Sequence, residues 1–284
     1  MDTLTVDTRK PHLVIRPAKG WASLDLGELW HFRDVLFTLA GRDIKLRYRQ
    51  TALGIAWVVL QPLLLSGIFT LVFSIFSKLP TSGVPPFLFS FAGLLGYGAF
   101  NSTVTKSSAS LIGNSQLVSK VYFPRLAIPL STAISCILDF GVSFVVVLVL
   151  MALYRYVPNE RMLLMPVFLL FFLLIGSGLG LLAAAMTVRY RDVQYIVPTM
   201  VTAAQFLSPI AYELTPKVCP PWLLPWYMIL NPLAALVEAF RWAVLGTGTV
   251  HWAYVGYSAG FSVVAFVFGM VMFKRMERQF ADVI

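Results

Sequence analysis

Residues 189–242, RYRDVQYIVPTMVTAAQFLSPIAYELTPKVCPPWLLPWYMILNPLAALVEAFRW, decide the fold of this chain. They begin with a charged corner, residues 189–192, and continue as an apolar run to Ile210. The next residues are still apolar, but they are interrupted by Pro216, Pro220, Pro221, Pro225 and Pro232. Proline removes a backbone donor and clashes with the preceding turn, so one straight helix cannot cover this segment. Because unsatisfied backbone groups are costly in lipid, we expect the broken segment to lie at a membrane surface or to dip into the membrane and line a path.

The composition is that of a membrane protein. Of the 284 residues, 58% are hydrophobic and 12% are charged, with a mean hydropathy of +0.78. Soluble domains carry about 25% charged residues. The net charge of +9 would suggest nucleic-acid binding in a soluble protein. Here the basic residues cluster between apolar runs, which favours membrane topology and contact with membrane lipids, and no nucleic acid is expected as a partner.

The apolar runs predict an all-α integral membrane protein with a single transmembrane domain over residues 28–284. Six spans are expected, at residues 52–76, 87–104, 126–153, 162–188, 193–210 and 252–273. Residues 1–27 are polar and lack the apolar core of a signal peptide, so we expect a cytosolic tail there.

Two features inside the predicted spans need partners in the fold. Gly93, Gly96 and Gly98 in the second span permit close helix contact. Asp139 falls near the middle of the third span, where a carboxylate is costly and should face the bundle or a cavity. Its partner is either a structural donor or a transported ion, and both alternatives stay open.

A helix is expected at residues 28–49, started by a capping box of Asp25 and Glu28. Apolar residues recur along it at helical spacing, and its end is densely basic. This pattern predicts an amphipathic interface helix at the inner membrane surface. It is either a lipid anchor or a platform that also touches a cytosolic partner.

The connection at residues 106–125 is long and polar for so apolar a chain. A short helix is expected at residues 114–120, ending before Pro124. A short helix on a cytosolic loop would be a docking site through which a partner could move the membrane helices. The alternative is an ordinary loop.

The basic residues also predict the orientation. Most lysines and arginines outside the spans fall on the side that holds both termini, which places both termini in the cytosol. Residues 211–245 then face outward, and we expect them to form an extracytoplasmic gate.

Several kinds of catalytic chemistry are absent from the sequence. It holds no Gly-x-x-x-x-Gly-Lys-Ser/Thr loop, no His-Glu-x-x-His and no Gly-x-Ser-x-Gly. Cys136 and Cys219 have no metal-ligand spacing. We therefore expect no enzyme, no metal site and no cofactor in this chain; if it pumps, a separate subunit supplies the energy of ATP.

Five stretches carry a resemblance to a known family. They are RDIKLRYR (42–49) followed by LGIAW (53–57); Gln61-Pro62; LVSKVYFPR (117–125); RYRD (189–192) with SPI (208–210); and LNPL (230–233) with Glu238, Arg241 and Trp242. In this order the chain resembles the membrane subunit of type-2 ABC exporters of polysaccharides, the group that moves O-antigen, capsule or teichoic-acid polymers.

The resemblance implies a homodimer with two cytosolic ATP-binding subunits, which bind ATP and magnesium, in the cytoplasmic (inner) membrane. The substrate it implies is a glycan carried on polyprenyl diphosphate. The residues it implies for coupling to the ATPase are Arg42, Lys45, Arg47, Asn114, Gln116, Leu117, Lys120, Tyr122, Phe123, Arg125, Arg189 and Asp192. Those it implies for the gate are Ser208, Pro209, Asn231, Pro232, Glu238 and Arg241.

Two further hypotheses concern the path of the polymer. A sugar has apolar faces as well as hydroxyls, so aromatic rings could form its track; the candidates are Trp57, Phe69, Phe73, Tyr97, Phe100, Phe206 and Tyr212. Glu238 and Arg241 are three residues apart on one helical face, and we expect them to pair or to contact a neighbouring chain.

Three alternatives remain beside the polysaccharide exporter. A drug or lipid exporter of similar architecture often carries a large extracytoplasmic domain or a fused ATPase. A membrane enzyme acting on lipid-linked sugars would need clustered catalytic residues. An ion-coupled secondary transporter would use Asp139.

Overall fold

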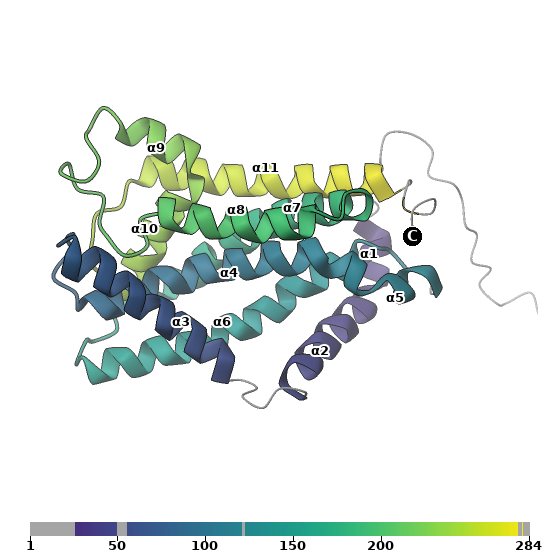
Figure 1. The fold of residues 1–284 in the computed structure, drawn as a ribbon, viewed down its shortest axis with the longest axis horizontal. Helices are drawn as coiled ribbons and strands as arrows, with labels where there is room; N and C mark the ends of the chain where they lie inside the picture. Colours follow the sequence, from purple (N-terminus) through teal and green to yellow (C-terminus); the bar gives the residue numbers. More distant parts are fainter. Residues whose placement is uncertain (1–25, 50–55, 121–122, 278–279, 281–284) are drawn as a thin grey trace, which may run out of the picture.

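The computed structural model describes residues 26–49, 56–120, 123–277 and 280. Within these residues every regular element is a helix, which confirms the all-α prediction (Figure 1). Five helical segments are long and apolar enough to cross a membrane. They are Ala56–Phe76, made of α3 (Ala56–Phe69) and the π-helix η1 (Thr70–Phe76); α4 (Pro86–Gly113); α6 (Ala127–Leu153); Glu160–Arg189, made of the short 3-10 helix η2 (Glu160–Leu164) and α7 (Met165–Arg189); and α11 (Trp252–Glu277).

The N-terminal part is two helices rather than the single predicted one. α1 (Leu26–His31) and α2 (Arg33–Arg49) are separated at Phe32. α2 packs on α6, where Leu39 and Ala40 are buried. Trp30 on α1 and Phe37 on α2 stay exposed. The predicted capping residue Asp25 and the side chain of Glu28 lie outside the described residues.

The centre of the bundle is formed by α4 and α7, with α10 (Pro232–Leu245) packed against both. Small residues allow this packing, as the sequence predicted. A Cβ at Gly96 would come within 2.9 Å of Phe172 on α7, and one at Gly178 within 2.3 Å of the Ala265 carbonyl on α11. Gly98, by contrast, faces open space. The glycines therefore fix which helices meet at the centre.

The second predicted span is longer than expected. We predicted an end at residue 104, but α4 continues to Gly113, so residues 106–113 are helical rather than part of a loop. Lys106, which marked the boundary in the sequence, forms an ion pair with Asp139 and so does not have to leave the bundle. The short helix predicted at residues 114–120 is confirmed as α5 (Ser115–Lys120).

The fifth predicted span, residues 193–210, is not a full helical span. α8 (Val193–Leu207) has 15 residues. Its length is therefore about 22 Å, less than the roughly 30 Å of a hydrocarbon core. The chain continues as an irregular, mostly buried segment from Ser208 to Leu214. Irregular backbone is tolerated at such a place only because protein surrounds it.

The proline-rich segment forms two further helices. α9 (Leu224–Leu230) and α10 are bent by 97° at Asn231, which is a broken span or a re-entrant loop by geometry. Pro225 and Pro232 each lie in the first turn of their helix, where a missing donor is harmless. Gly246 ends α10 with a φ of 73°, in the left-handed region that favours glycine.

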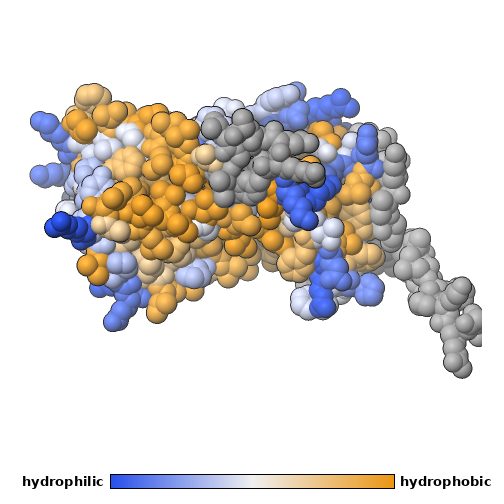
Figure 2. Space-filling model, turned by 90° about the horizontal axis from the view of Figure 1, so that it is seen from below, coloured by the Kyte–Doolittle hydropathy of each residue, from blue (hydrophilic) through white to orange (hydrophobic). Residues whose placement is uncertain are grey.

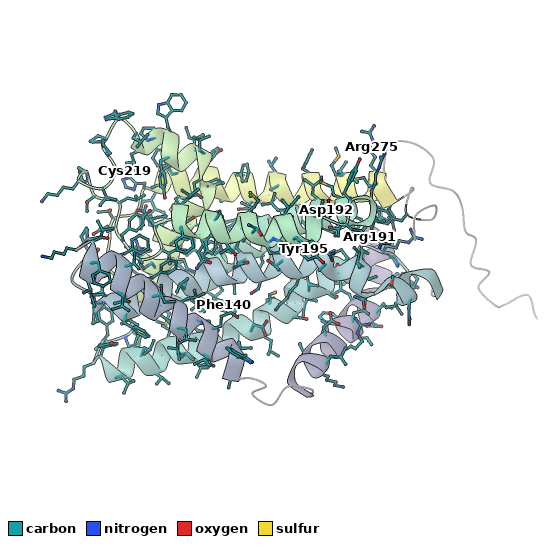
Figure 3. All side chains as sticks on the ribbon, in the orientation of Figure 1. Phe140, Arg191, Asp192, Tyr195, Cys219 and Arg275 are labelled. Atoms are coloured by element: carbon teal, nitrogen blue, oxygen red, sulfur yellow. The ribbon has the colours of Figure 1, made fainter. Side chains whose placement is uncertain are left out.

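The molecule has two polar ends and an apolar middle. Figure 2 shows a broad hydrophobic band between hydrophilic ends. We call them the α5 end, where α1, α5 and the last turn of α11 lie, and the α9 end, where α9 and the start of α11 lie (Figure 1). Arg191, Asp192 and Arg275 are at the α5 end, and Cys219 is at the α9 end (Figure 3).

The crossing of α7 and α11 yields a test of the packing. A Cβ at Gly269 would lie 2.2 Å from the Gly178 carbonyl oxygen, whereas one at Gly256, on the same helix, meets nothing within 4 Å. We expect Gly269→Ala to push the two helices apart, cost about 1–3 kcal/mol of stability, and lower the unfolding midpoint of the purified chain. Gly256→Ala is the matched control, and equal midpoints for the two variants would contradict this packing.

Candidate functional site

The broken end of α8 is held by side chains from the next helices. Tyr227 on α9 donates its hydroxyl to the Leu207 carbonyl at 2.6 Å. The Asn231 amide, at the bend between α9 and α10, donates to the Leu207 carbonyl at 3.3 Å and to the Ser208 hydroxyl at 3.1 Å. A helix end leaves carbonyls without partners, and these contacts satisfy some of them. Side-chain hydrogen bonds therefore join the end of α8 to the corner between α9 and α10.

Arg241 holds the segment that follows the break. Its side chain is buried in α10, and Nη1 donates to the Pro209 carbonyl at 2.7 Å and to the Ile210 carbonyl at 3.2 Å. The guanidinium also stacks over Phe89 of α4, with 3.9 Å to the ring centroid. Carbonyl dipoles and an aromatic face are the partners that allow a cation to stay in an apolar interior.

Gly93 brings the same segment against α4. A Cβ at this position would lie 2.3 Å from the Ile210 carbonyl oxygen. Only glycine allows this approach, so α4, the irregular segment after α8, and α10 meet at one point. The predicted gate residues Ser208, Pro209, Asn231 and Arg241 therefore lie together; their role as a gate stays a prediction.

The expected direct pair between Glu238 and Arg241 is not formed. Arg241 points to backbone carbonyls, and Glu238 faces His251, with 3.5 Å between Oε2 and Nδ1. The geometry is too loose for a hydrogen bond, so this contact is electrostatic and becomes an ion pair when His251 is protonated. Residues three apart share a helix face, but the Arg241 guanidinium is turned to two carbonyls and a ring, while Glu238 stays buried beside His251.

Glu213 ties the segment after the break to the turn that precedes α4. The Ser82 hydroxyl donates to Glu213 Oε2 at 2.7 Å, and the Glu213 amide donates to the Pro80 carbonyl at 3.1 Å. Cys219 is buried in this segment, and burial raises the pKa of its thiol, so it stays neutral. The Glu213 contacts attach the segment that follows the break to the loop before α4.

The aromatic candidates fall into two groups rather than one track. Phe206, Phe69, Phe73 and Tyr212 form a chain of rings near the α9 end, with centroid separations of 5.3, 5.5 and 5.6 Å. Phe206 is exposed, Phe73 and Tyr212 are half-buried, and Phe69 is buried. This chain joins η1 to the end of α8.

Tyr97 and Phe100 form the other aromatic contact, on α4. Both are buried in the core, and the Tyr97 hydroxyl donates to the Val201 carbonyl at 2.6 Å. Tyr97 and the exposed Trp57 line a cavity of 310 Å³ between α3, α4 and α6. Phe100 does not line this cavity. It packs against Tyr97 in the buried core.

The cavity also contains the intramembrane carboxylate. Asp139 of α6 accepts a hydrogen bond from Lys106 Nζ of α4 at 2.5 Å, and both side chains line the cavity wall. The sequence left open whether the partner of Asp139 is a structural donor or a transported ion. In the structure Lys106 is a structural donor to it. Phe140, labelled in Figure 3, lines the same cavity from α6.

Two of the predicted coupling residues, Arg42 and Asn114, are in contact near the α5 end. Arg42 of α2 donates through Nη2 to Asn114 Oδ1 at 2.6 Å and to Asp43 Oδ1 at 2.7 Å. The Asn114 amide donates in turn to the Ser110 carbonyl. Arg42 therefore connects the interface helix to the junction of α4 and α5, two elements that are far apart in sequence.

The other members of this set differ in exposure. Arg125 donates to the Glu277 carbonyl at 3.4 Å, and Phe123 is buried beside it. Exposed members are Lys45, Gln116, Arg189 and Asp192, and Leu117 is half-buried. Tyr122 and the side chains of Arg47 and Lys120 lie outside the described residues.

A family model described as "ABC-2 type transporter" matches residues 34–245. The chain belongs to the ABC-2 type transporter family. The matched region begins in α2 and ends with α10, so it contains the α2–α5 connection, the cavity and the broken end of α8.

Several relatives of the same family cover most of the chain. The O-antigen export system permease protein RfbA of Klebsiella pneumoniae is 25% identical over 259 residues, which is 90% of this chain and 97% of that protein. RfbA of Myxococcus xanthus is 30% identical over 215 residues, 75% of this chain and 81% of that protein. The polysialic acid transport protein KpsM of Escherichia coli is 26% identical over 247 residues, 83% and 91% of the two chains.

Sequence reasoning missed four residues of this ABC-2 chain that matter for its geometry: Phe89, Tyr227, His251 and Lys106. Lys106 gave a signal, because a lysine inside an apolar helical pattern needs a partner in the bundle. The other three gave none, since each acts through a contact between distant segments. Within the described residues no group of three or more histidine, cysteine, aspartate or glutamate side chains could hold a metal ion.

The contacts of Arg241 predict the outcome of charge reversal. Arg241→Glu should prevent correct folding of the α9 end, because it removes two donors and leaves carbonyls unpaired, at about 1–3 kcal/mol for each. The double variant Glu238→Arg/Arg241→Glu should not recover, since backbone carbonyls cannot change sign. The measurement is the yield and unfolding midpoint of purified protein, with Lys217→Glu at an exposed position as control. Recovery in the double variant would show a direct pair that the geometry lacks.

Proposed function

We propose that this chain is the membrane subunit of an ATP-driven exporter that moves a polysaccharide across the cytoplasmic membrane. The observation that carries the proposal is the match over nearly full length to permeases named for O-antigen export. The second similarity, to proteins named for polysialic acid transport, points to the same class of polymer. The chain is then a transport subunit, and a partner subunit hydrolyses ATP.

The assembly we propose contains two copies of this chain and two ATP-binding subunits. Support comes from α3, an apolar helix that is little buried and exposes Trp57, Leu60, Leu64 and Ile68. Such a face is covered by lipid or by a second copy. A polymer path between two copies would lie beside α3 and the exposed side of α8.

The orientation we propose places the α5 end and both termini in the cytosol. Basic residues with described, partly or fully exposed side chains are more frequent there than at the α9 end, in line with the positive-inside rule. They include Arg33, Arg42, Arg125, Arg189, Arg191, Lys274 and Arg275 at the α5 end, against Lys78, Arg155, Arg161 and Lys217 at the other. The break after α8 then faces outward as an extracytoplasmic gate.

Coupling to the ATPase would run through the Arg42–Asn114 connection. α5 is short, its residues Ser115 and Gln116 are exposed, and it follows Asn114 directly. A force applied to α5 would act on α4 and, through Arg42, on α2 at the same time. Because α4 touches the irregular segment at Gly93, one rigid helix joins the docking end to the gate end.

The substrate we propose is a glycan carried on polyprenyl diphosphate, and the ring chain from Phe206 to Tyr212 would be its contact near the gate. Aromatic faces bind sugars without strict sequence preference, because every pyranose has an apolar face. Only the exposed and half-buried rings of the chain, Phe206, Phe73 and Tyr212, can serve in this conformation.

Reconstitution with the ATP-binding subunit tests the proposed function. We expect the two proteins to purify as a stoichiometric complex whose ATP hydrolysis rises when lipid-linked polysaccharide is present in the proteoliposome. Hydrolysis is measured by phosphate release and export by protection of the glycan from an external glycosidase. A chain that binds no ATPase in mild detergent or in nanodiscs would refute the proposal.

The same assay separates docking from coupling. Asn114→Ala removes the acceptor of Arg42, a contact to a charged group that contributes about 1.5–3 kcal/mol. The variant should still bind the ATPase but lose most of the stimulation by glycan. Ser115→Ala, at the neighbouring exposed position, is the control. Equal stimulation in both variants would remove Arg42–Asn114 from the coupling path.

If the ring chain contacts the polymer, removing one ring should slow export without stopping it. Phe73→Ala and Tyr212→Ala should each slow glycan export about threefold, since an aromatic contact contributes about 0.5–1.5 kcal/mol, while basal ATP hydrolysis stays unchanged. Ile75→Ala removes an exposed apolar side chain from the same element, η1, and serves as control. Export rates that match the control for both ring variants would show that these rings do not touch the polymer.

A further inference from the structure

The cavity between α3, α4 and α6 carries polar groups on every helix that lines it. Its ion pair lies deep in the bundle, because Asp139 is twelve residues from the start of α6 and fourteen from its end. Amide and hydroxyl side chains line the cavity as well, and they come from α3, α4, α6 and α8: Gln61, Asn101, Ser102, Ser143 and Gln205. Apolar side chains fill the space between these groups. Such a mixed lining suits a ligand that is itself both polar and apolar.

Two of these polar side chains are buried without a partner. Gln205 is 5% exposed and Ser143 is 7% exposed. Neither side chain has a hydrogen-bond partner among the residues that the structure describes, yet both line the cavity. Gln205 is four residues after Val201, whose carbonyl accepts from Tyr97, so it lies on the face of α8 that packs on α4. Because a buried amide or hydroxyl is costly without a partner, these two groups point to an occupant that carries donors and acceptors.

The cavity opens beside an aromatic ring. Trp57 and Gln61 of α3 are exposed, and both line the cavity, so a ligand reaches it past this helix. An indole face beside amides and hydroxyls matches a pyranose, which has an apolar C–H face and an edge of hydroxyls. The volume of 310 Å³ is at the lower end of ligand pockets, so one or two sugar rings fit rather than a length of polymer.

We propose that this cavity is a binding subsite for one or two uncharged pyranose residues of the exported polymer. The identity of the occupant rests on the proposed export of a polysaccharide. One ring would stack on Trp57 at the opening. Deeper in the cavity, sugar hydroxyls would supply the partners that Gln205 and Ser143 lack.

The ion pair makes the subsite selective for uncharged sugars. Lys106 Nζ and Asp139 Oδ2 are 2.5 Å apart, and together they have no net charge. An anionic sugar could bind Lys106 only by displacing Asp139, which would leave a carboxylate without its lysine in the middle of the bundle. A cationic sugar would leave the ammonium without its carboxylate in the same way. A hydroxyl can donate to the carboxylate or accept from the ammonium while the pair stays intact.

Saturation-transfer NMR with free sugars measures this binding. The full chain is placed in nanodiscs and titrated with uncharged trisaccharides of mannose, rhamnose and N-acetylglucosamine. The charged probes are a sialic acid trimer, which is anionic, and a glucosamine trimer, which is cationic. We expect at least one uncharged trisaccharide to bind, and to bind about tenfold more tightly than either charged trimer, the ratio that the loss of one hydrogen bond to a charged group gives.

Variants at two glycines locate the subsite on the chain. Gly98→Leu should abolish binding, because a Cβ at Gly98 meets no atom within 4 Å and the longer side chain grows into the cavity that Gly98 lines. Gly141→Leu is the matched control. Gly141 is an exposed glycine of α6 whose Cβ also meets no atom, and it does not line the cavity. This variant should bind as the unchanged chain does.

Two further variants test the roles of single side chains. Gln205→Leu should weaken binding about fivefold, as the loss of one neutral hydrogen bond does, and should raise the unfolding midpoint, because it removes a buried amide that has no partner. Asp139→Asn leaves the charge of Lys106 without its carboxylate. It should therefore shift the preference of the subsite from the uncharged trisaccharides to the sialic acid trimer.

Three results would each overturn the proposal: no binding of any uncharged trisaccharide, equal or tighter binding of a charged trimer to the unchanged chain, or the same affinity in Gly98→Leu and Gly141→Leu. Unfolding midpoints are measured in parallel, so that loss of the fold is not taken for loss of the sugar. If Asp139→Asn does not fold, the two glycine variants decide the test. The assay uses neither ATP nor the ATP-binding subunit, so its failure would leave the exporter function intact.

Discussion

Broken backbone inside an apolar protein needs donors, and the rest of this structure is arranged to supply them. The carbonyls of Leu207, Pro209 and Ile210 follow one another where α8 ends before the segment has crossed a membrane. Each would be costly to bury alone. Their donors come from Tyr227, Asn231 and Arg241, which are brought to the break by the 97° bend between α9 and α10. The bend therefore supplies the hydrogen-bond donors that the break needs.

This dependence bears on how the α9 end could open. The donors are side chains on a separate corner of the chain, so moving α8 away from α10 would leave several carbonyls and one guanidinium without partners at once. The free-energy cost of such a step is offset only if water or a hydroxyl-rich ligand replaces the lost contacts. A polysaccharide carries both donors and acceptors along its whole length. If the α9 end is the proposed gate, this geometry favours opening in the presence of that substrate over opening in its absence.

The sequence predicts most of the architecture and little of the contact geometry. Hydropathy and proline positions predicted the long apolar helices, α5 and the broken segment, because these depend on residues close together in the chain. The end of α8 was placed at residue 210 rather than Leu207, although Pro209 disfavours a helical conformation at Ser208 and was a signal for the earlier end. The end of α4 was placed too early because Lys106 was taken as a boundary, although Asp139, thirty-three residues away, keeps it in the bundle.

Two of the wrong predictions, the Glu238–Arg241 pair and the end of α4, concern the partner of a buried charge. The spacing of Glu238 and Arg241 predicted a pair, yet the arginine is compensated by fixed carbonyls and the ring of Phe89. Lys106, which has a carboxylate partner, sits in a cavity. Carbonyls are part of the backbone and change only when the fold changes, so Arg241 is a structural clamp.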